Sequence, residues 1–353
     1  MESPKDNRKK EMLIAAAVAA VLTGGVAAKM LLTPGSEEQA KNDVAEMIKN
    51  VNATYDLSTA TENLEITQGG TYTLSGVMKD GLSVVVRSSE AVKIVLNGAT
   101  INATSTAAIA QTGSGALTIA LAENTENTLS DGGNSEQDGC IYSAGALTID
   151  GGNGILRVTG QQKEGEGIAT EAADMTINGG MIYVAATDDG LNAGGDGGTI
   201  TINGGELHIT AGGDGIDSNK NAVFNGGKVY VAGSSAGGNA AIDTDGGYVV
   251  NGGLVAALGS DMLEAPESNS AQYTVAMTLG TTYKEGSEID LENSDGVAVI
   301  SFDAMDDFKT LVLSSDQLTT GTYTLKVNGA AVQTVTITDK VTTVGSATGG
   351  PQH

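Results

Sequence analysis

The 353-residue chain contains one cysteine, four prolines, two histidines and no tryptophan, and only 3% of its residues are aromatic. A single cysteine, Cys140, excludes an intrachain disulfide and a cysteine-rich metal site. Basic residues are also scarce: 18 stand against 43 acidic residues, for a formal net charge of −25. Nucleic acid and anionic lipid are therefore poor partners, because polyanions are bound by clustered lysine and arginine. The scarcity of proline leaves the backbone donors of strands intact.

Glycine, in contrast, is abundant, with 50 residues, and much of it recurs in one phrase of an apolar residue, Asn or Asp, and two glycines. The polar residue of this phrase is Asp150, Asn178, Asn203, Asn225 and Asn251, at intervals of 28, 25, 22 and 26 residues. Such a period is typical of a solenoid, in which each repeat buries its apolar face against its neighbours. The segments between the turns are short, β-branched and alternating, so the sequence predicts an all-β, single-stranded β-solenoid.

Alternation along the strands predicts an outward column of flat side chains. After each Gly-Gly, pairs such as Leu156 and Val158 occupy inward positions, and the residue between them points outward. This outward column consists of Arg157, Tyr183, His208, Tyr230 and Ala256. Sugar rings stack on tyrosine, but a tyrosine column is also explained by cross-strand packing. We assign the first four residues as candidate carbohydrate-binding residues, with packing as the alternative.

A second phrase, rich in acidic residues, occupies another turn of each repeat. Its spacing places Asp189 and Asp214 in one column and Asn192, Asp217 and Asp243 in the next. With Asp188 and Asp245 nearby, carboxylates gather at rung spacing, which either raises a pKa or recruits a cation. Oxygen ligands without cysteine select Ca²⁺, so these seven residues form a predicted calcium site. The alternative is that Asp-Gly only makes tight turns.

Two further columns are interpreted as structural. The Asn-Gly-Gly asparagines are expected to satisfy backbone groups at the bends of successive rungs, with a role as ligands as the alternative. Cys140 aligns with Ile168, Leu191, Ile216 and Ile242, which predicts a small buried side chain rather than a reactive thiol.

The N-terminal segment is predicted to direct export. Basic residues up to Lys10 precede an apolar run from Met12 to about Val26, and residues 1–32 fit either a cleaved signal peptide or a signal anchor. Residues 33–60 are predicted to form a linker with a helix at 37–50 that caps the first rung. Residues 61–340 are predicted to form the β-helix, with 270–340 as modified rungs and 341–353 as a disordered tail. The bulk of the chain is then expected outside the cytoplasm, at the cell surface.

The phrases together resemble a family of secreted bacterial carbohydrate-binding domains. Besides the two repeated turns, the resemblance rests on the segments 66–76, 94–98, 127–132, 311–315 and 321–325. It implies a calcium-containing, right-handed parallel β-helix, related to pectate lyases, that binds cellulose or polygalacturonate without cleaving it. The acidic turn of the family matches Asp188-Asp189-Gly190 and Asp214-Gly215. Ala240-Ala241 departs from that pattern, where Asp-Gly is expected.

Two other classes of function remain open from the sequence. A pectate-lyase-type enzyme needs a base beside the metal, and Lys220 is the one basic residue adjoining the predicted site. A surface adhesin or filament subunit would assemble end to end through uncovered solenoid ends. We expect the binding module, with a polysaccharide as partner and Ca²⁺ as cofactor.

Overall fold

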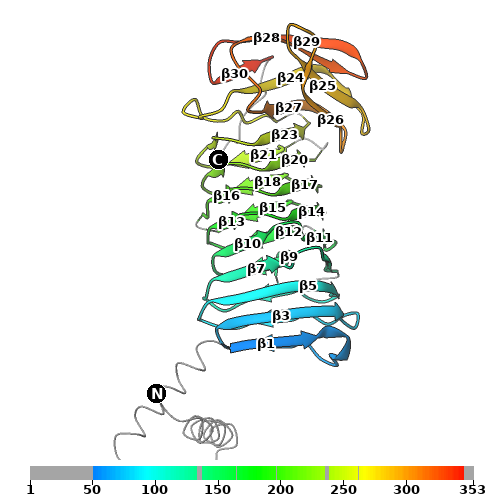
Figure 1. Cartoon of the computed structure of the whole chain (residues 1–353), viewed down its shortest axis with the longest axis vertical. Helices are drawn as coiled ribbons and strands as arrows, with labels where there is room; N and C mark the ends of the chain where they lie inside the picture. Colours follow the sequence, from blue (N-terminus) through cyan, green and yellow to red (C-terminus); the bar gives the residue numbers. More distant parts are fainter. Residues whose placement is uncertain are drawn as a thin grey trace, which may run out of the picture.

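The computed structural model describes residues 51–132, 137–163, 165–195, 197–234, 238–260 and 262–345. This part of the chain forms an elongated stack of strands. Strand β1 lies at one end of the stack, and the C-terminal strands β24 to β30 lie at the other (Figure 1). Its helical content is a single 3₁₀ turn, η2 (Leu57–Thr59). Among the described residues, no helix is long and apolar enough to cross a membrane. The prediction of an all-β solenoid is confirmed.

Each turn of the solenoid contributes strands to up to three faces, and neighbouring turns pair in parallel. The acidic face is an eight-stranded sheet, whose steps make about seven turns, formed by β2 (Leu64–Ile66), β4 (Val84–Val86), β6 (Ile109–Gln111), β9 (Gly139–Ser143), β12 (Glu166–Thr170), β15 (Leu191–Ala193), β18 (Ile216–Ser218) and β21 (Ile242–Thr244). The asparagine face is formed by β7 (Leu117–Leu121), β10 (Leu147–Gly151), β13 (Met175–Ile177), β16 (Ile200–Ile202), β19 (Ala222–Phe224) and β22 (Tyr248–Val250). The aromatic face is formed by β8 (Glu126–Ser130), β11 (Ile155–Gly160), β14 (Met181–Ala186), β17 (Glu206–Ala211), β20 (Lys228–Ala232) and β23 (Leu254–Gly259).

The first turns are simpler, because long strands replace the separate strands of the asparagine and aromatic faces. These are β1 (Val51–Asp56), β3 (Gly70–Val77) and β5 (Val92–Asn102). The two halves of β5 pair with β7 and β8, so the corner between the two faces begins within this strand. The strand at 51–56 corrects the predicted linker at 33–60, since Val51 already pairs with Gly70. The predicted helix at 37–50 lies outside the described residues.

Inside the stack, aliphatic side chains of equivalent rungs lie on top of one another. Ile168, Leu191 and Ile216 pair in register and are fully buried. These side chains form one continuous apolar core along the solenoid. Each Å² of apolar surface that the core buries stabilises the fold by roughly 25 cal/mol. Cys140 is also buried, as predicted, and burial raises the pKa of its thiol. Its predicted column was wrong, because Ile141 pairs with Ile168 and Cys140 comes one residue earlier.

The parallel ladder ends at β23, where an antiparallel unit closes the C-terminal end. Strand β27 (Phe308–Ser314) pairs antiparallel with β23 and β24 (Thr274–Tyr283), and β30 (Val341–Val344) joins β24. The strand at 341–344 corrects the predicted disordered tail at 341–353, of which residues 346–353 lie outside the described residues. A separate antiparallel sheet contains β25 (Glu288–Glu292), β26 (Ala298–Asp303), β28 (Gly321–Val327) and β29 (Ala330–Ile337). The prediction that 270–340 form modified rungs was thus wrong. This unit has its own apolar core and covers the last turn.

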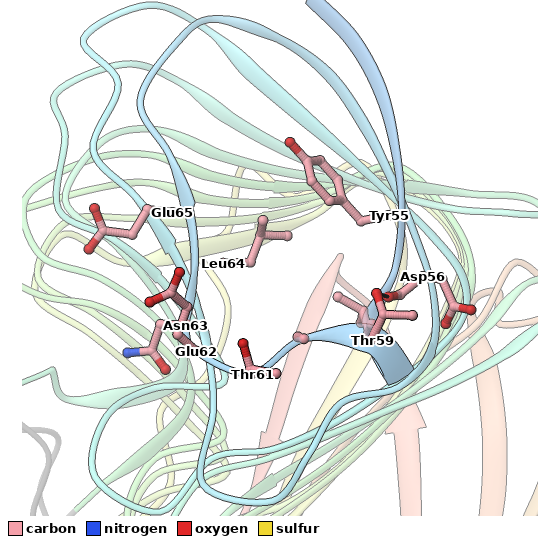
Figure 2. A pocket seen from close by; sticks show the side chains of 10 residues that line it. Tyr55, Asp56, Thr59, Thr61, Glu62, Asn63, Leu64 and Glu65 are labelled. Atoms are coloured by element: carbon pink, nitrogen blue, oxygen red, sulfur yellow. Dashed lines mark hydrogen bonds between the residues drawn. The ribbon is translucent and has the colours of Figure 1, made fainter.

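The N-terminal end of the described solenoid is hollow. Residues 55–57 and 59–65 line an opening of about 770 Å³. Figure 2 views it from close by, with Leu64 beside the space enclosed by the first turns and Tyr55 coming from β1. Val51, Ala53, Ala60 and Leu64 pack against the core and are only partly buried.

Candidate functional site

The predicted outward column lies on the aromatic face, and strand register assembles it. Arg157 pairs with Tyr183, Tyr183 with His208, and His208 with Tyr230. The ring centroids of Tyr183 and His208 are 5.0 Å apart and those of His208 and Tyr230 are 4.9 Å apart, with interplanar angles of 12° and 17°. The guanidinium carbon of Arg157 lies 4.4 Å from the centre of the Tyr183 ring. These four residues form one stacked column, which we call the aromatic strip.

Stacking within the strip determines what it can offer a ligand. The inner rings face one another, so their faces are covered and their edges and polar atoms are directed outward. Charged residues flank the strip: Glu126 binds Arg157 at 2.6 Å, and Glu206 contacts both His208 and Lys228 at 3.1 Å. The hydrogen bonds from His208 and Lys228 lower the pKa of Glu206. The strip is thus a row of hydrogen-bonding groups repeated at the spacing of the rungs.

The strip ends at Tyr230, because the C-terminal unit covers the next position. Ala256 pairs with Tyr230 in the same column, but it also pairs with Leu313 of β27 and is fully buried. Phe302 of β26 contacts Tyr230 at 6.0 Å between ring centroids. The aromatic face is therefore covered beyond Tyr230, whereas beyond Arg157 the column continues with Thr128 of β8.

The predicted calcium ligands come together on the acidic face and on the turns that lead into it. Strand register places Asn192 beside Asp217 and Asp217 beside Asp243. The amide nitrogen Nδ2 of Asn192 donates to Asp189 Oδ2 and to Asp217 Oδ2, at 3.0 Å each. Asp189 Oδ1 accepts the backbone N–H of Asp214 at 2.7 Å. Asn192 is thus the donor that holds two carboxylates of neighbouring turns together.

The remaining predicted ligands surround this pair. Asp214 Oδ1 accepts the backbone N–H of Ala240, at the position where the acidic turn departs from Asp-Gly. Burial is the largest cause of a raised pKa at Asp189, at Asp214 (to about 8) and at Asp217 (to about 7). The negative charges of neighbouring carboxylates raise these pKa values further. The carboxylates that act in this way belong to Asp188, Asp189, Asp217, Asp243 and Asp245. We call these six aspartates and Asn192 the carboxylate cluster.

The chemistry of the carboxylate cluster fits a hard cation, although it is not a ready-made metal centre. Within the described ranges, no three Asp, Glu, His or Cys side chains gather in a metal-binding arrangement. Its side chains nevertheless supply only oxygen ligands besides the Asn192 amide, and the charges that act most strongly on Asp214 and Asp217 are all negative. A rotation of the Asn192 amide would turn its oxygen toward Asp189 and Asp217. Oxygen-only sites of this kind suit Ca²⁺.

The sequence analysis missed one carboxylate that contacts the end of the acidic face. Glu264 accepts the backbone N–H of Thr244 at 2.8 Å and its hydroxyl at 2.7 Å. It therefore satisfies a donor on the last strand, β21. Burial raises the pKa of Glu264 to about 7. No repeat marks this residue, because it comes from the segment after the last Asn-Gly-Gly turn.

The asparagine column is structural, as predicted, but its partners differ from the prediction. The side chains bond to one another rather than to the backbone of the bend: Asn178 donates to Asp150 at 2.8 Å and Asn203 donates to Asn178 at 2.9 Å. Asn225 and Asn251 continue the ladder at 2.9 and 3.0 Å. We call this column the asparagine ladder.

Comparison with known proteins places the chain in a family. Residues 60–296 match the family described as carbohydrate-binding domain-containing protein. The chain belongs to this family. A relative of the same description from Acetivibrio thermocellus is 34% identical over 140 residues, which are 37% of this chain and 47% of that protein. The chain therefore spans about half the length of this relative.

Among solved structures, the chain is similar to the polysaccharide lyase-like protein from C. thermocellum, in its gadolinium derivative. The sequence identity is 28%, the TM-score is 0.44, and the similarity covers 57% of this chain and 93% of that chain.

Proposed function

We propose that this carbohydrate-binding domain binds a plant cell-wall polysaccharide, such as cellulose or polygalacturonate, along the aromatic strip and does not cleave it. The observation that carries the proposal is the repetition of the strip: three stacked rings at 4.9–5.0 Å offer equivalent groups at regular intervals. A polymer with one repeating sugar can meet such a row with the same contacts at successive rungs. The family match supports a carbohydrate as the ligand.

The contact mode follows from the covered ring faces. Because Tyr183 and His208 stack on each other, a sugar cannot lie flat between them, and it meets ring edges, phenol hydroxyls and the exposed Arg157. Hydrogen bonding to glycan hydroxyls is therefore the main interaction that we propose for this surface, rather than the stacking of sugar on ring that the sequence suggested.

We propose that Ca²⁺ is held by Asp189, Asp217 and the Asn192 amide oxygen, with Asp188, Asp214, Asp243 and Asp245 around them. When bound, the ion would neutralise the mutual repulsion of these carboxylates and would provide a bridge to acidic glycans. Strand register would position the ion, because Asn192, Asp217 and Asp243 occupy equivalent places on successive turns.

Binding is favoured over a lyase reaction by the position of Lys220. A lyase needs its base beside the metal. Lys220 is exposed on the turn after β18, and the charges that act most strongly on Asp214 and Asp217 are those of other aspartates. For this reason we do not assign it a catalytic role.

We extend the proposal to the ends of the molecule. Residues 1–32 would direct export or anchor the chain at the cell surface, and the coil would be right-handed, as the family resemblance implies. A helix at 37–50 would cover the hollow beside Leu64 and would leave no open end for filament assembly.

The proposal is tested by retention of the protein on insoluble cellulose and on polygalacturonate, with calcium or with EDTA. Tyr183→Ala and Tyr230→Ala are expected to weaken retention about tenfold or more, since both remove contacts from the strip. Tyr273→Ala is the control, because that ring stacks with Lys340 outside the strip. Retention equal to wild type in both strip variants, or no retention of wild type, would contradict the proposal, and unsaturated uronate absorbance would establish a lyase instead.

A further inference from the structure

The imidazole of His208 lies in the middle of the aromatic strip, and protein groups enclose it on three sides. Tyr183 of β14 and Tyr230 of β20 cover its two faces, with ring centroids 5.0 and 4.9 Å away. Its Nε2 atom contacts Oε1 of Glu206, on its own strand, at 3.1 Å. The side chain is 29% exposed, and because both faces are covered, this exposed area belongs to the edge of the ring. A ligand on the strip therefore meets that edge.

The contact with Glu206 determines which ring nitrogen is available to a ligand. Hydrogen bonds from His208 and Lys228 lower the pKa of Glu206, so its carboxylate is ionised and can only accept. Nε2 therefore donates, and the neutral ring carries its hydrogen on that atom. Nδ1 is then the acceptor nitrogen, and no protein group among the described residues is bonded to it. A proton taken up by the ring goes to Nδ1 and turns this acceptor into a donor.

The charges along the aromatic strip cancel as long as the imidazole is neutral. Lys228 binds Glu206 at 3.1 Å on the next rung, and Arg157 binds Glu126 at 2.6 Å at the other end of the strip. The remaining titratable groups packed against the ring are the two tyrosine phenols, which carry no charge near neutral pH. One proton on His208 thus gives the strip a net positive charge, on a chain whose formal net charge is −25.

The surroundings of the ring can accommodate that proton. A cation interacts favourably with the faces of tyrosine rings, and the imidazolium has one on each side. The carboxylate of Glu206 at Nε2 forms a charge-assisted hydrogen bond with the protonated ring. Histidine is the side chain that ordinarily changes its charge between about pH 5 and pH 8. The centre of the strip can therefore change both its charge and its hydrogen-bonding character within this range.

We propose that His208 determines which class of glycan the aromatic strip retains, because its ring presents an acceptor at high pH and a charged donor at low pH. The neutral ring accepts a hydrogen bond from a sugar hydroxyl, which suits a neutral glycan such as cellulose. The imidazolium donates from Nδ1 to a uronate carboxylate, which suits an acidic glycan such as polygalacturonate. This inference rests on the proposed function, since it assigns a role to one residue of the same strip, and it needs no metal ion.

The test is the retention of the full chain on polygalacturonate and on cellulose at pH 5 and at pH 8, in EDTA and at constant ionic strength. EDTA removes any calcium bridge to the acidic glycan. The uronates stay ionised at pH 5, because carboxyl groups titrate near pH 4. On going from pH 8 to pH 5, the affinity of wild type for polygalacturonate relative to cellulose should rise by roughly fivefold or more, since a charged hydrogen bond is about twice as strong as a neutral one.

Two substitutions at His208 separate the effect of the proton from the effect of the side chain. His208→Gln is polar and takes up no proton, so the ratio of the two affinities should be the same at both pH values. His208→Arg carries a planar cation at every pH, so it should prefer polygalacturonate at pH 8 as strongly as at pH 5. Glu264→Gln is the matched control: burial raises the pKa of Glu264 to about 7, but this residue lies outside the strip, so the variant should respond to pH as wild type does.

A wild-type affinity ratio that does not change between pH 5 and pH 8 would overturn the role of His208, and so would a change that His208→Gln retains in full. Either result, obtained with a protein that is retained on a glycan, leaves the proposed function intact. Retention on neither glycan at either pH contradicts both proposals. If circular dichroism shows that His208→Gln is unfolded, His208→Arg decides, because a wild-type response to pH in that variant would also overturn the inference.

Discussion

The asparagine ladder and the carboxylate cluster are built in the same way, by repeating one polar residue at the spacing of the rungs, yet their electrostatics are opposite. In the ladder, Asn203 donates to Asn178 and accepts from Asn225, so every amide is satisfied by the next. In the cluster, ionised Asp189 and Asp217 can only accept; the amide of Asn192 donates to both, and Asp189 also accepts the backbone N–H of Asp214.

The difference lies in the donor inventory of the two side chains. An amide has two donors and an acceptor, so a column of amides extends indefinitely. An ionised carboxylate has acceptors alone, so a column of them needs a proton, a donor or a cation at each step. The same backbone repeat therefore produces a stabilising hydrogen-bonded column, the asparagine ladder, on one face of the solenoid and a candidate ion site, the carboxylate cluster, on another.

The largest difference between the asparagine ladder and the carboxylate cluster should be in how each makes the stability of the protein depend on pH. The raised pKa values of Asp214 (about 8) and Asp217 (about 7) mean that the folded state binds more protons than the unfolded state. The calcium-free protein should therefore lose stability as pH rises from about 4 to about 8, by about 2–4 kcal/mol after allowance for solvent screening. Melting temperatures across this range, in EDTA and in excess calcium, measure the effect.

Calcium should flatten that pH profile, because the ion replaces the proton as the compensating charge. A melting temperature that rises with pH in EDTA, or that is identical with and without calcium, would show that the carboxylates are not in the state that we infer.

A smaller effect is expected when one carboxylate is converted into an amide. Asp217→Asn should raise the calcium-free stability at pH 8 by about 1 kcal/mol, since it removes a buried like charge and adds a donor between Asn192 and Asp243. The same change should weaken calcium binding about tenfold, or about 1.4 kcal/mol. Denaturant titrations in EDTA and in calcium should move in opposite directions, and a loss of stability in both would contradict the comparison.

The smallest effect is expected from the converse change in the ladder. Asn203→Asp removes the donor to Asn178 and leaves the bond from Asn225, so it should cost about 1 kcal/mol of unfolding free energy above pH 5. Asp150→Asn, at the foot of the ladder, is the matched control, since residue 150 only accepts there. Equal stability of Asn203→Asp and wild type by denaturant titration would mean that the ladder contributes nothing.

Alternation and repeat length sufficed to predict the stacked columns. The aromatic strip from Arg157 to Tyr230 and the pairs Asn192–Asp217 and Asp217–Asp243 appear in register where the spacing placed them. The position of Cys140 was wrong by one residue, because alignment by phrase does not fix the start of β9 relative to β12. The C-terminal unit was also misjudged, since its short alternating strands do not reveal whether they pair in parallel or antiparallel.

The sequence by itself determined the all-β solenoid, its core and the membership of its polar columns, because a side-chain period of two and a fixed turn length leave little freedom for register. Only the tertiary structure decided how those columns interact: that the rings cover one another's faces, that Asn192 joins two carboxylates, and that Glu206 contacts both His208 and Lys228. Such contacts depend on side-chain rotamers and on residues one turn away in space. The pattern of residues along the sequence specifies neither of them.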